Sequence, residues 1–266
     1  MDNPACRAFT RPISHHHACR AASEPLHPQP MTHPHGPDDE KLSFLHRLER
    51  RVSAATGFDL TTEKGRKRAR WHYRWLDHGI LRKRWTNLDE IAPGVWRSNH
   101  PDRARLERYR DMGIHTVLTL RGESKAAFHV FEQEDCVALG LTLEVAKLSA
   151  RSLVTKAEML HVLDVFERIE KPFVMHCKSG ADRAGLASAM WMMHMEGQSV
   201  EKARDQLSLR YLHIRRSKTG ILDYVLDAYE ADTRTNPMSL RDWVEARYEG
   251  ERLTTEFHAA RAEGRA

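Results

Sequence analysis

From about residue 94 the chain alternates short apolar runs of β character with longer stretches of helical period. The runs read "GVWRS", "IHTVLTLR", "LTLEVAKL" and "KPFVMHC". Helical segments such as "PDRARLERYRDMG" lie between them. Strands separated by helices of this length indicate parallel pairing with right-handed crossovers. The predicted fold class is therefore α/β, with a mainly parallel central sheet flanked by helices.

Two helices are predicted on either side of the last strand. Thr155 and Glu158 have the spacing of a capping box. One apolar face follows, made by Met159, Val162, Leu163, Phe166 and Ile169. After the strand, "AGLASAMWMMHM" is apolar nearly all round, which is typical of a helix buried in the centre of a domain. Further helices are expected near 199–211, near 217–232, and from Ser239 after the Asn236-Pro237 break.

The N-terminal part has a different character. Residues 1–38 hold most of the eleven prolines and a His15–His17 run, which predicts a disordered tail. Residues 39–56 have helical period, and residues 63–85 carry nine Lys and Arg against Glu63 and Asp77. Arg66, Arg70 and Arg74 recur at helical spacing beside Trp71 and Trp75. Such a helix either lies on an anionic membrane through residues 64–85 or packs its tryptophans on the domain.

Composition narrows the function classes. The formal net charge is +5 and the pI about 9.1, which favours acidic partners such as phosphoproteins or anionic lipid. No run of 18 apolar residues and no signal-peptide core occur, so a cytoplasmic protein is expected, with peripheral membrane contact left open. Cys6, Cys19, Cys136 and Cys177 match no zinc or disulfide spacing, so neither a metal nor another cofactor is expected.

The candidate chemistry lies in "FVMHCKSGADRAGL", residues 173–186. Residues 178–183 are predicted to connect the strand to the buried helix, with backbone N–H groups turned inward. These N–H groups and the positive end of the helix form an anion site of phosphate size and favour a nucleophilic thiolate at Cys177. The planar guanidinium of Arg183 can bind two phosphate oxygens at once.

The chain here resembles the cysteine-dependent protein tyrosine and dual-specificity phosphatase superfamily, whose signature is His-Cys, five residues, then Arg. His176, Cys177 and Arg183 match the signature, and Gly180 falls at the loop glycine. The resemblance covers roughly residues 90–230. It implies a phosphocysteine intermediate on Cys177, a supporting role for His176, and hydrolysis without metal. The phosphate ligands that it implies are Lys178, Ser179, Gly180, Ala181 and Arg183.

Two positions depart from this pattern. Ala184 stands where many members place a Ser or Thr that helps the sulfur to leave, so Ser179 substitutes or the second step is slow. The separate loop that carries the acid in classical members has no aspartate here. Asp182 is therefore the predicted general acid, with Glu144 as the substitute; the alternative role of Asp182 is to orient Arg183 or cap the helix.

The sequence thus predicts four segments. They are a disordered tail (1–38), a basic helical extension (39–89), a cysteine phosphatase domain (90–232) and a C-terminal helical extension (233–266). The expected function is a protein tyrosine or dual-specificity phosphatase acting on a phosphorylated protein. A phospholipid or phosphoinositide phosphatase and a non-catalytic phosphate-binding module remain as alternatives, and no nucleic acid partner is expected.

Overall fold

The computed structural model describes residues 58–75 and 85–264, all within the unit Ala54–Ala266. The predicted tail at 1–38, the predicted helix at 39–56 and residues 76–84 of the basic segment lie outside the described residues. Among the described helices, none is both long enough and apolar enough to cross a membrane.

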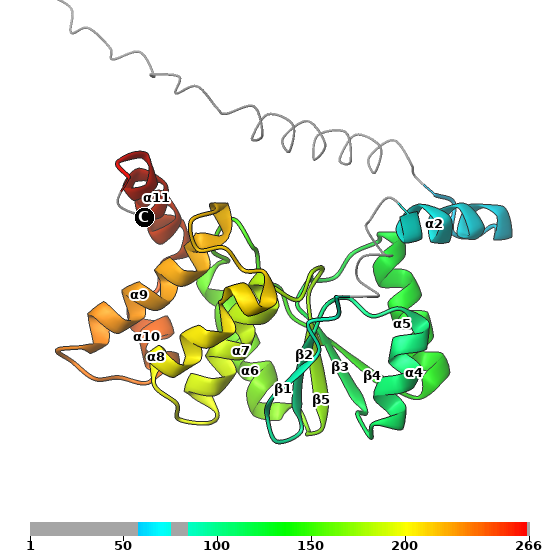
Figure 1. Cartoon of the computed structure of the whole chain (residues 1–266), viewed down its shortest axis with the longest axis horizontal. Helices are drawn as coiled ribbons and strands as arrows, with labels where there is room; N and C mark the ends of the chain where they lie inside the picture. The colour runs from blue at the N-terminus through cyan, green and yellow to red at the C-terminus, as the bar shows by residue number, and fades with distance from the viewer. Residues whose placement is uncertain (1–57, 76–84, 265–266) are drawn as a thin grey trace, which may run out of the picture. The chain divides into compact units, whose positions relative to one another are not determined.

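Five strands form one sheet in the order β1-β2-β5-β3-β4 (Figure 1). Their bounds are β1 Asp89–Ala92, β2 Val95–Ser98, β3 Thr116–Thr119, β4 Thr142–Val145 and β5 Phe173–His176. β2, β5, β3 and β4 pair in parallel, whereas β1 forms an antiparallel hairpin with β2. The predicted α/β class with a mainly parallel sheet is confirmed, and the hairpin strand β1 adds an edge that begins before the predicted start of the sheet.

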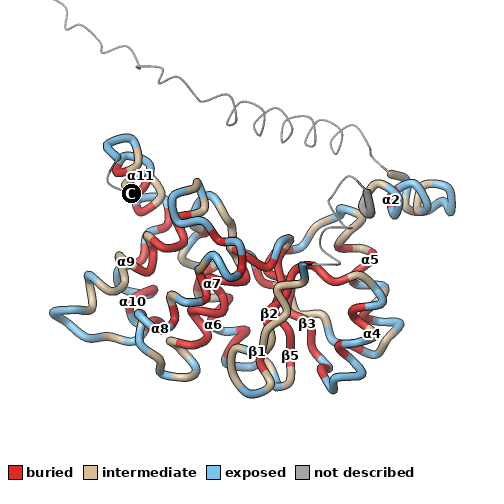
Figure 2. Tube along the Cα trace, in the orientation of Figure 1, coloured by how far each residue is buried: buried red, intermediate tan, exposed pale blue. Residues whose placement is uncertain are grey.

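Helices cover both faces of the sheet (Figure 1). α4 (Arg103–Asp111) and α5 (Ala127–Leu139) pack over Val117 and Val174 in one core. α6 (Lys156–Arg168) and α7 (Asp182–His194) pack over Leu118 and Met175 in the other. Neighbouring residues of one strand thus point to opposite cores, as the two-residue period of a strand requires. Figure 2 shows that burial is concentrated on the strands and on α7.

The helices on either side of β5 form as the sequence predicts. Thr155 and Glu158 make both bonds of the capping box at the start of α6, and the apolar face of α6 is buried. α7 is buried along most of its length, which agrees with its apolar sequence. Cys136 is a buried core residue of α5, and burial raises the pKa of its thiol to about 12.

Two helices that the sequence predicts as continuous are interrupted. At each interruption a buried side chain donates a hydrogen bond to a backbone carbonyl. The 199–211 segment is a short α8 (Val200–Ala203) followed by two 3-10 turns, Arg204–Gln206 and Leu209–Tyr211. The helix leaves its path where the carbonyl of Gln206 accepts a bond from the buried Arg97. The C-terminal segment is α10 (Leu240–Ala246) and α11 (Gly250–Ala262), separated where the buried Tyr248 hydroxyl donates to Val154 O at 2.6 Å. α9 (Ile221–Thr233) lies between these two segments.

The described part of the basic segment is the helix α2 (Glu63–Trp75). Arg66 forms an ion pair with Glu134 of α5, and the guanidiniums of Arg66 and Arg70 lie over the ring of Phe131. Trp71 is 61% exposed. The predicted packing of the helix through its tryptophans is therefore wrong for Trp71, because the arginines make the contact with α5.

Candidate active site

Cys177 lies at the carboxyl end of β5, at the centre of the sheet, where its thiol is only 1% exposed. α7 begins at Asp182, so the connection is shorter than the predicted 178–183, and Asp182 and Arg183 occupy the first helical turn. We call residues 177–183 the cysteine loop. Placing Arg183 on the helix fixes its backbone by helical hydrogen bonds rather than by loop packing.

The cysteine loop is wrapped around the sulfur by one backbone contact. The N–H of Gly180 donates to Cys177 Sγ at 3.3 Å. Gly180 has φ of +74°, and a Cβ there would lie 2.7 Å from the backbone nitrogen of Asn99. Only glycine fits both the left-handed backbone and this close approach.

The buried Arg97 of β2 holds the outer side of the cysteine loop. Its Nη2 donates to Gly180 O at 2.6 Å and to Ala181 O at 3.2 Å, while Nη1 donates to Gln206 O and Oε1 at 2.8 and 2.7 Å. Its guanidinium lies 3.6 Å from the centre of the Tyr211 ring. Burial lowers the pKa of Arg97 to about 10, opposed by charges that include Cys177 and Asp89, so the side chain remains cationic at neutral pH. One side chain from β2 therefore fixes two successive carbonyls of the cysteine loop.

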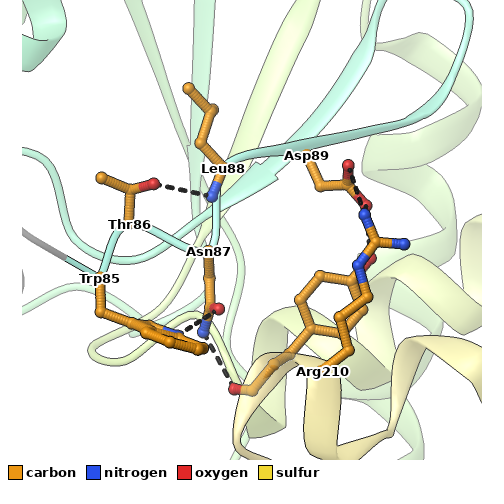
Figure 3. Close-up of a pocket in the computed structure, with 7 residues that line it drawn as sticks. Trp85, Thr86, Asn87, Leu88, Asp89 and Arg210 are labelled. Carbon is orange, nitrogen blue, oxygen red and sulfur yellow. Dashed lines mark hydrogen bonds and ion pairs between the residues drawn. The ribbon is translucent and has the colours of Figure 1, made fainter.

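A second support crosses from the segment before β1. Asn87 donates through Nδ2 to Ser179 O and to Tyr211 O, each at 3.0 Å, and accepts from Trp85 Nε1 at 2.7 Å. Beside these bonds lies a pocket of about 230 Å³ lined by residues 85–89, Arg210 and Tyr211 (Figure 3). Asp89 accepts from the Tyr211 hydroxyl and from Arg210 on one side of the pocket. The pocket therefore lies directly next to the cysteine loop.

His176 connects the base of the cysteine loop to α5. Its Nδ1 lies 3.3 Å from Cys177 O, and its Nε2 lies 2.7 Å from Oε1 of the buried Glu132. His100 Nδ1 is 3.7 Å from the same oxygen, so His100, Glu132 and His176 are a set of ligand types that could hold a divalent cation. Arg121 Nη1 lies 3.3 Å from His100 Nδ1. The positive charge of this guanidinium would repel a divalent cation bound by the three residues. The observed contacts fit a role of Glu132 in positioning His176.

The remaining predicted phosphate ligands follow Cys177 in the loop. The side chain of Arg183 is half-buried and makes no hydrogen bond or ion pair within residues 58–75 and 85–264. Lys178 is half-buried, and Ser179 is exposed with its Oγ accepting from Ala181 N–H at 3.4 Å. Ala184 is fully buried in the core of α7. Ser179 carries the one hydroxyl of the cysteine loop, and its role in the departure of the sulfur stays a prediction.

The two candidates for the general acid lie in different environments. Asp182 accepts from His213 Nδ1 at 2.8 Å, and the other ring nitrogen of His213 lies 2.7 Å from Asp223 Oδ2. Burial alone lowers the pKa of His213, but the hydrogen bonds to Asp182 and Asp223 outweigh it and raise the pKa to about 9. Glu144, on β4 as predicted, is held by Arg168 through two bonds of 2.9 and 2.8 Å. The acid role of Asp182 stays a prediction.

The chain resembles known proteins over this same region. Residues 86–208 match the model of the tyrosine phosphatase family. The dual specificity protein phosphatase TpbA of Pseudomonas aeruginosa is 26% identical over 125 residues, covering 46% of this chain and 53% of TpbA. Both matches support the superfamily of cysteine-dependent tyrosine and dual-specificity phosphatases for this region of the chain. The recognition made from His176, Cys177 and Arg183 is confirmed at the level of the superfamily.

Solved structures of phosphatases also resemble the chain. A putative phosphatase from Shewanella putrefaciens CN-32 has 15% identity and a TM-score of 0.45, covering 57% of this chain and 97% of that one. P. aeruginosa TpbA in complex with pTyr has 19% identity and a TM-score of 0.40, covering 56% and 96%. The chain spans about half the length of the curated relatives that it matches.

Sequence reasoning missed three residues of this superfamily site. Arg97, His213 and Asn87 contact the cysteine loop from segments distant in sequence. Arg97 carried one usable signal, since a charged residue stands inside a strand that is otherwise predicted to be buried. Asn87 and His213 carried none, because each lies outside the predicted strands and buried helices.

Proposed function

We propose that the protein is a phosphomonoester hydrolase that works through a phosphocysteine on Cys177, without a metal, and that its substrates are phosphotyrosine or mixed phosphoprotein sites. The observation that carries this proposal is the cysteine loop itself. Its sulfur accepts a backbone N–H at the end of a central strand, its carbonyls are bound from outside by Arg97, and Arg183 stands on the first helical turn. A loop of this kind accommodates a dianion.

The proposed reaction has two steps. The Cys177 thiolate attacks phosphorus, and the bond to the leaving oxygen breaks while Arg183 and the loop N–H groups stabilise the equatorial oxygens. Water then attacks the phosphocysteine, and the sulfur leaves. Ser179 is the candidate hydroxyl that supports departure of the sulfur in place of the residue at 184.

The test is hydrolysis of p-nitrophenyl phosphate and of phosphotyrosine peptides with reductant and a chelator present. Cys177→Ser should remove turnover, and Arg183→Lys should reduce it by about 10²-fold or more because an ammonium cannot reproduce the bidentate contact. Cys136→Ala is the matched control, since it removes the other described thiol from a position in the core of α5. Turnover that survives Cys177→Ser, or that the chelator removes, would contradict the assignment.

A second candidate, a phospholipid or phosphoinositide substrate, is favoured by one surface. Leu209, Leu212 and Ile214 are 71%, 58% and 52% exposed, and Trp85 is 49% exposed. We call these four residues the apolar rim. Tyr211 and His213, between them in sequence, are buried and bound to the supports of the cysteine loop. The apolar rim must therefore border the active site.

The charges next to the apolar rim are basic. Arg210, Arg215, Arg216 and Lys218 are exposed, and the stretch 209–218 contains no acidic residue. Aliphatic side chains with flanking cations suit the surface of an anionic bilayer. On this candidate the protein is cytoplasmic and peripheral to the membrane, with the α2 segment as a further basic contact.

A substrate panel separates these candidates. Purified protein is offered phosphotyrosine peptides, phosphoinositides and phosphatidylglycerophosphate in vesicles, and kcat/KM is compared. Preference for peptides supports the phosphoprotein substrate, and preference for vesicle substrates supports the lipid. A burst of one dephosphorylated product per protein, with the phosphoryl group retained on Cys177 and no further turnover, would instead support the non-catalytic phosphate-binding module.

A further inference from the structure

His213 is a buried histidine whose two ring nitrogens both face carboxylates. Its side chain has no exposed surface, and the partner atoms Asp182 Oδ1 and Asp223 Oδ2 lie at 2.8 and 2.7 Å. Asp182 is on the first turn of α7, next to Arg183, whereas Asp223 is a buried residue of α9. One histidine thus connects the cysteine loop to the second helical layer.

The burial of this trio is asymmetric. Asp223 keeps only 6% of its side chain exposed, while Asp182 keeps 21%. An imidazole between two carboxylates carries both ring protons, because each carboxylate needs a donor. The buried carboxylate of Asp223 therefore positions the histidine, whereas the carboxylate of Asp182 is partly exposed to solvent beside the cysteine loop.

We propose that Asp182 and His213 act as one proton-transfer unit for the leaving oxygen, with Asp223 as the residue that positions and charges His213. The proposal rests on the phosphatase function proposed above. In it His213 is a positioning residue that acts through Asp182, and Asp182 is the group that meets the substrate.

The proton balance of the unit closes over one turnover. Before reaction, one proton lies between His213 Nδ1 and Asp182 Oδ1, and when it is on oxygen Asp182 is a carboxylic acid. As sulfur bonds to phosphorus, the leaving oxygen takes this proton, and the unit becomes a carboxylate beside a neutral imidazole that keeps its proton toward Asp223. In the second step the attacking water gives its proton to Asp182, and the unit returns to its first state.

This arrangement explains how a carboxylate next to two cations can serve as an acid. Asp182 lies beside Arg183 on the first turn of α7 and accepts from His213 Nδ1 at 2.8 Å. The proton need not reside on Asp182 between turnovers, because His213 stores it within 2.8 Å. The raised pKa of His213, about 9, keeps the unit protonated at neutral pH. The described charged groups that act on His213 are Asp182 from α7 and Asp223 from α9.

The first test is His213→Gln in the full chain, assayed with p-nitrophenyl phosphate and with an alkyl phosphate. General acid catalysis is worth about 10²–10⁴-fold for a poor leaving group, so the alkyl phosphate should lose about 10²-fold in kcat and p-nitrophenyl phosphate less than about 3-fold. His194→Gln is the matched control, because it removes a His194–Glu167 pair of 2.7 Å at the far end of the same helix. Equal losses on both substrates would overturn the proposal.

The second test does not depend on the folding of the glutamine variant. Asp223→Asn keeps an oxygen for His213 Nε2 but removes the charge, so the alkaline limb of kcat for the alkyl phosphate should move at least about 1 pH unit toward acid. A limb that stays in place in folded Asp223→Asn protein would overturn the proposal. Failure of the function itself is distinguishable, because Cys177→Ser would then leave turnover of both substrates intact.

Discussion

Arg97 and Gly180 form the bond that shapes the cysteine loop: the buried guanidinium donates to the carbonyl at 2.6 Å. Ala181 O accepts from the same nitrogen at 3.2 Å, so one side chain binds two successive loop carbonyls. A peptide whose carbonyl is fixed outward has its neighbouring N–H groups directed inward. The geometry of the anion site thus depends on a cation in β2, outside the signature sequence.

Arg97→Met should therefore damage catalysis without touching the reacting atoms. Each buried carbonyl left without a donor costs about 1–3 kcal/mol, and a loop displaced by about 1 Å loses about 10²-fold in rate. The expected result is a lower melting temperature and a fall of about 10²-fold in kcat/KM for p-nitrophenyl phosphate. Arg168→Met, which breaks the bidentate pair with Glu144 on β4, is the control and should leave kcat/KM within about 2-fold. Wild-type kcat/KM in folded Arg97→Met protein would refute the bracing role.

Gly180→Ala tests the close approach of the loop to Asn99. The left-handed backbone costs an alanine about 1–2 kcal/mol, and a Cβ placed 2.7 Å from Asn99 N and from Asn87 Cβ forces a shift of the loop. We expect a total loss of about 2–5 kcal/mol in the free energy of unfolding, together with loss of turnover. Gly197→Ala is matched to it, with φ of +62° and nothing within 4 Å of the added carbon. If the two variants unfold at the same denaturant concentration, the contact with Asn99 is not tight.

Part of this architecture follows from local sequence patterns, and part does not. The capping box of Thr155 and Glu158 and the apolar period of α6 are local, so the sequence predicts that helix correctly. The strand, cysteine and buried helix are contiguous, which is why the centre of the site was predicted from the sequence alone. Arg97 and Gly180 are 83 residues apart, and Asp182 and His213 are 31 apart, so no local pattern reports their contacts.

The segment around His213 shows why hydrophobicity fails as a guide there. Tyr211 and His213 are buried while Leu212 and Ile214 are exposed, the reverse of what their polarity predicts. The polar side chains are drawn inward by Asp89 and Asp182, which satisfies their donors inside the protein. Leu212 and Ile214, which alternate with these polar residues along the segment, are left on the exposed side.

The free energy of unfolding should fall as pH rises through the titration of His213. The folded pKa, about 9, lies above the ordinary value of 6.5 because the hydrogen bonds to Asp182 and Asp223 outweigh burial. The native state therefore binds the proton more tightly, so the contribution is complete below about pH 6.5 and is lost by about pH 9. At 1.36 kcal/mol per unit it amounts to about 3 kcal/mol. Urea unfolding at a series of pH values measures it.

The contribution of His213 is identified by how the free energy of unfolding changes with pH, rather than by its absolute value. Cys136 and Tyr211 also have raised pKa values, each about 12, and contribute at higher pH. The quantity to compare is the wild-type curve minus the His213→Gln curve, which should decline by about 3 kcal/mol over this range. His194→Gln is the control for the loss of a histidine whose partner, Glu167, lies on the surface. If the difference between the wild-type and His213→Gln curves does not change with pH, the proton is bound by another group.

Leu212 offers a test in which stability and membrane contact move in opposite directions. It is 58% exposed and has φ of +63°, a left-handed conformation that Asn tolerates better than Leu. Leu212→Asn should thus raise the free energy of unfolding by up to about 1 kcal/mol and weaken sedimentation with phosphatidylglycerol vesicles, while turnover of p-nitrophenyl phosphate stays unchanged. Leu209→Asn, on a residue that is 71% exposed in a 3-10 turn, should weaken vesicle binding without the gain in stability. Vesicle binding equal to wild type in both variants would remove the apolar rim as a membrane surface and leave the phosphoprotein substrate as the remaining candidate.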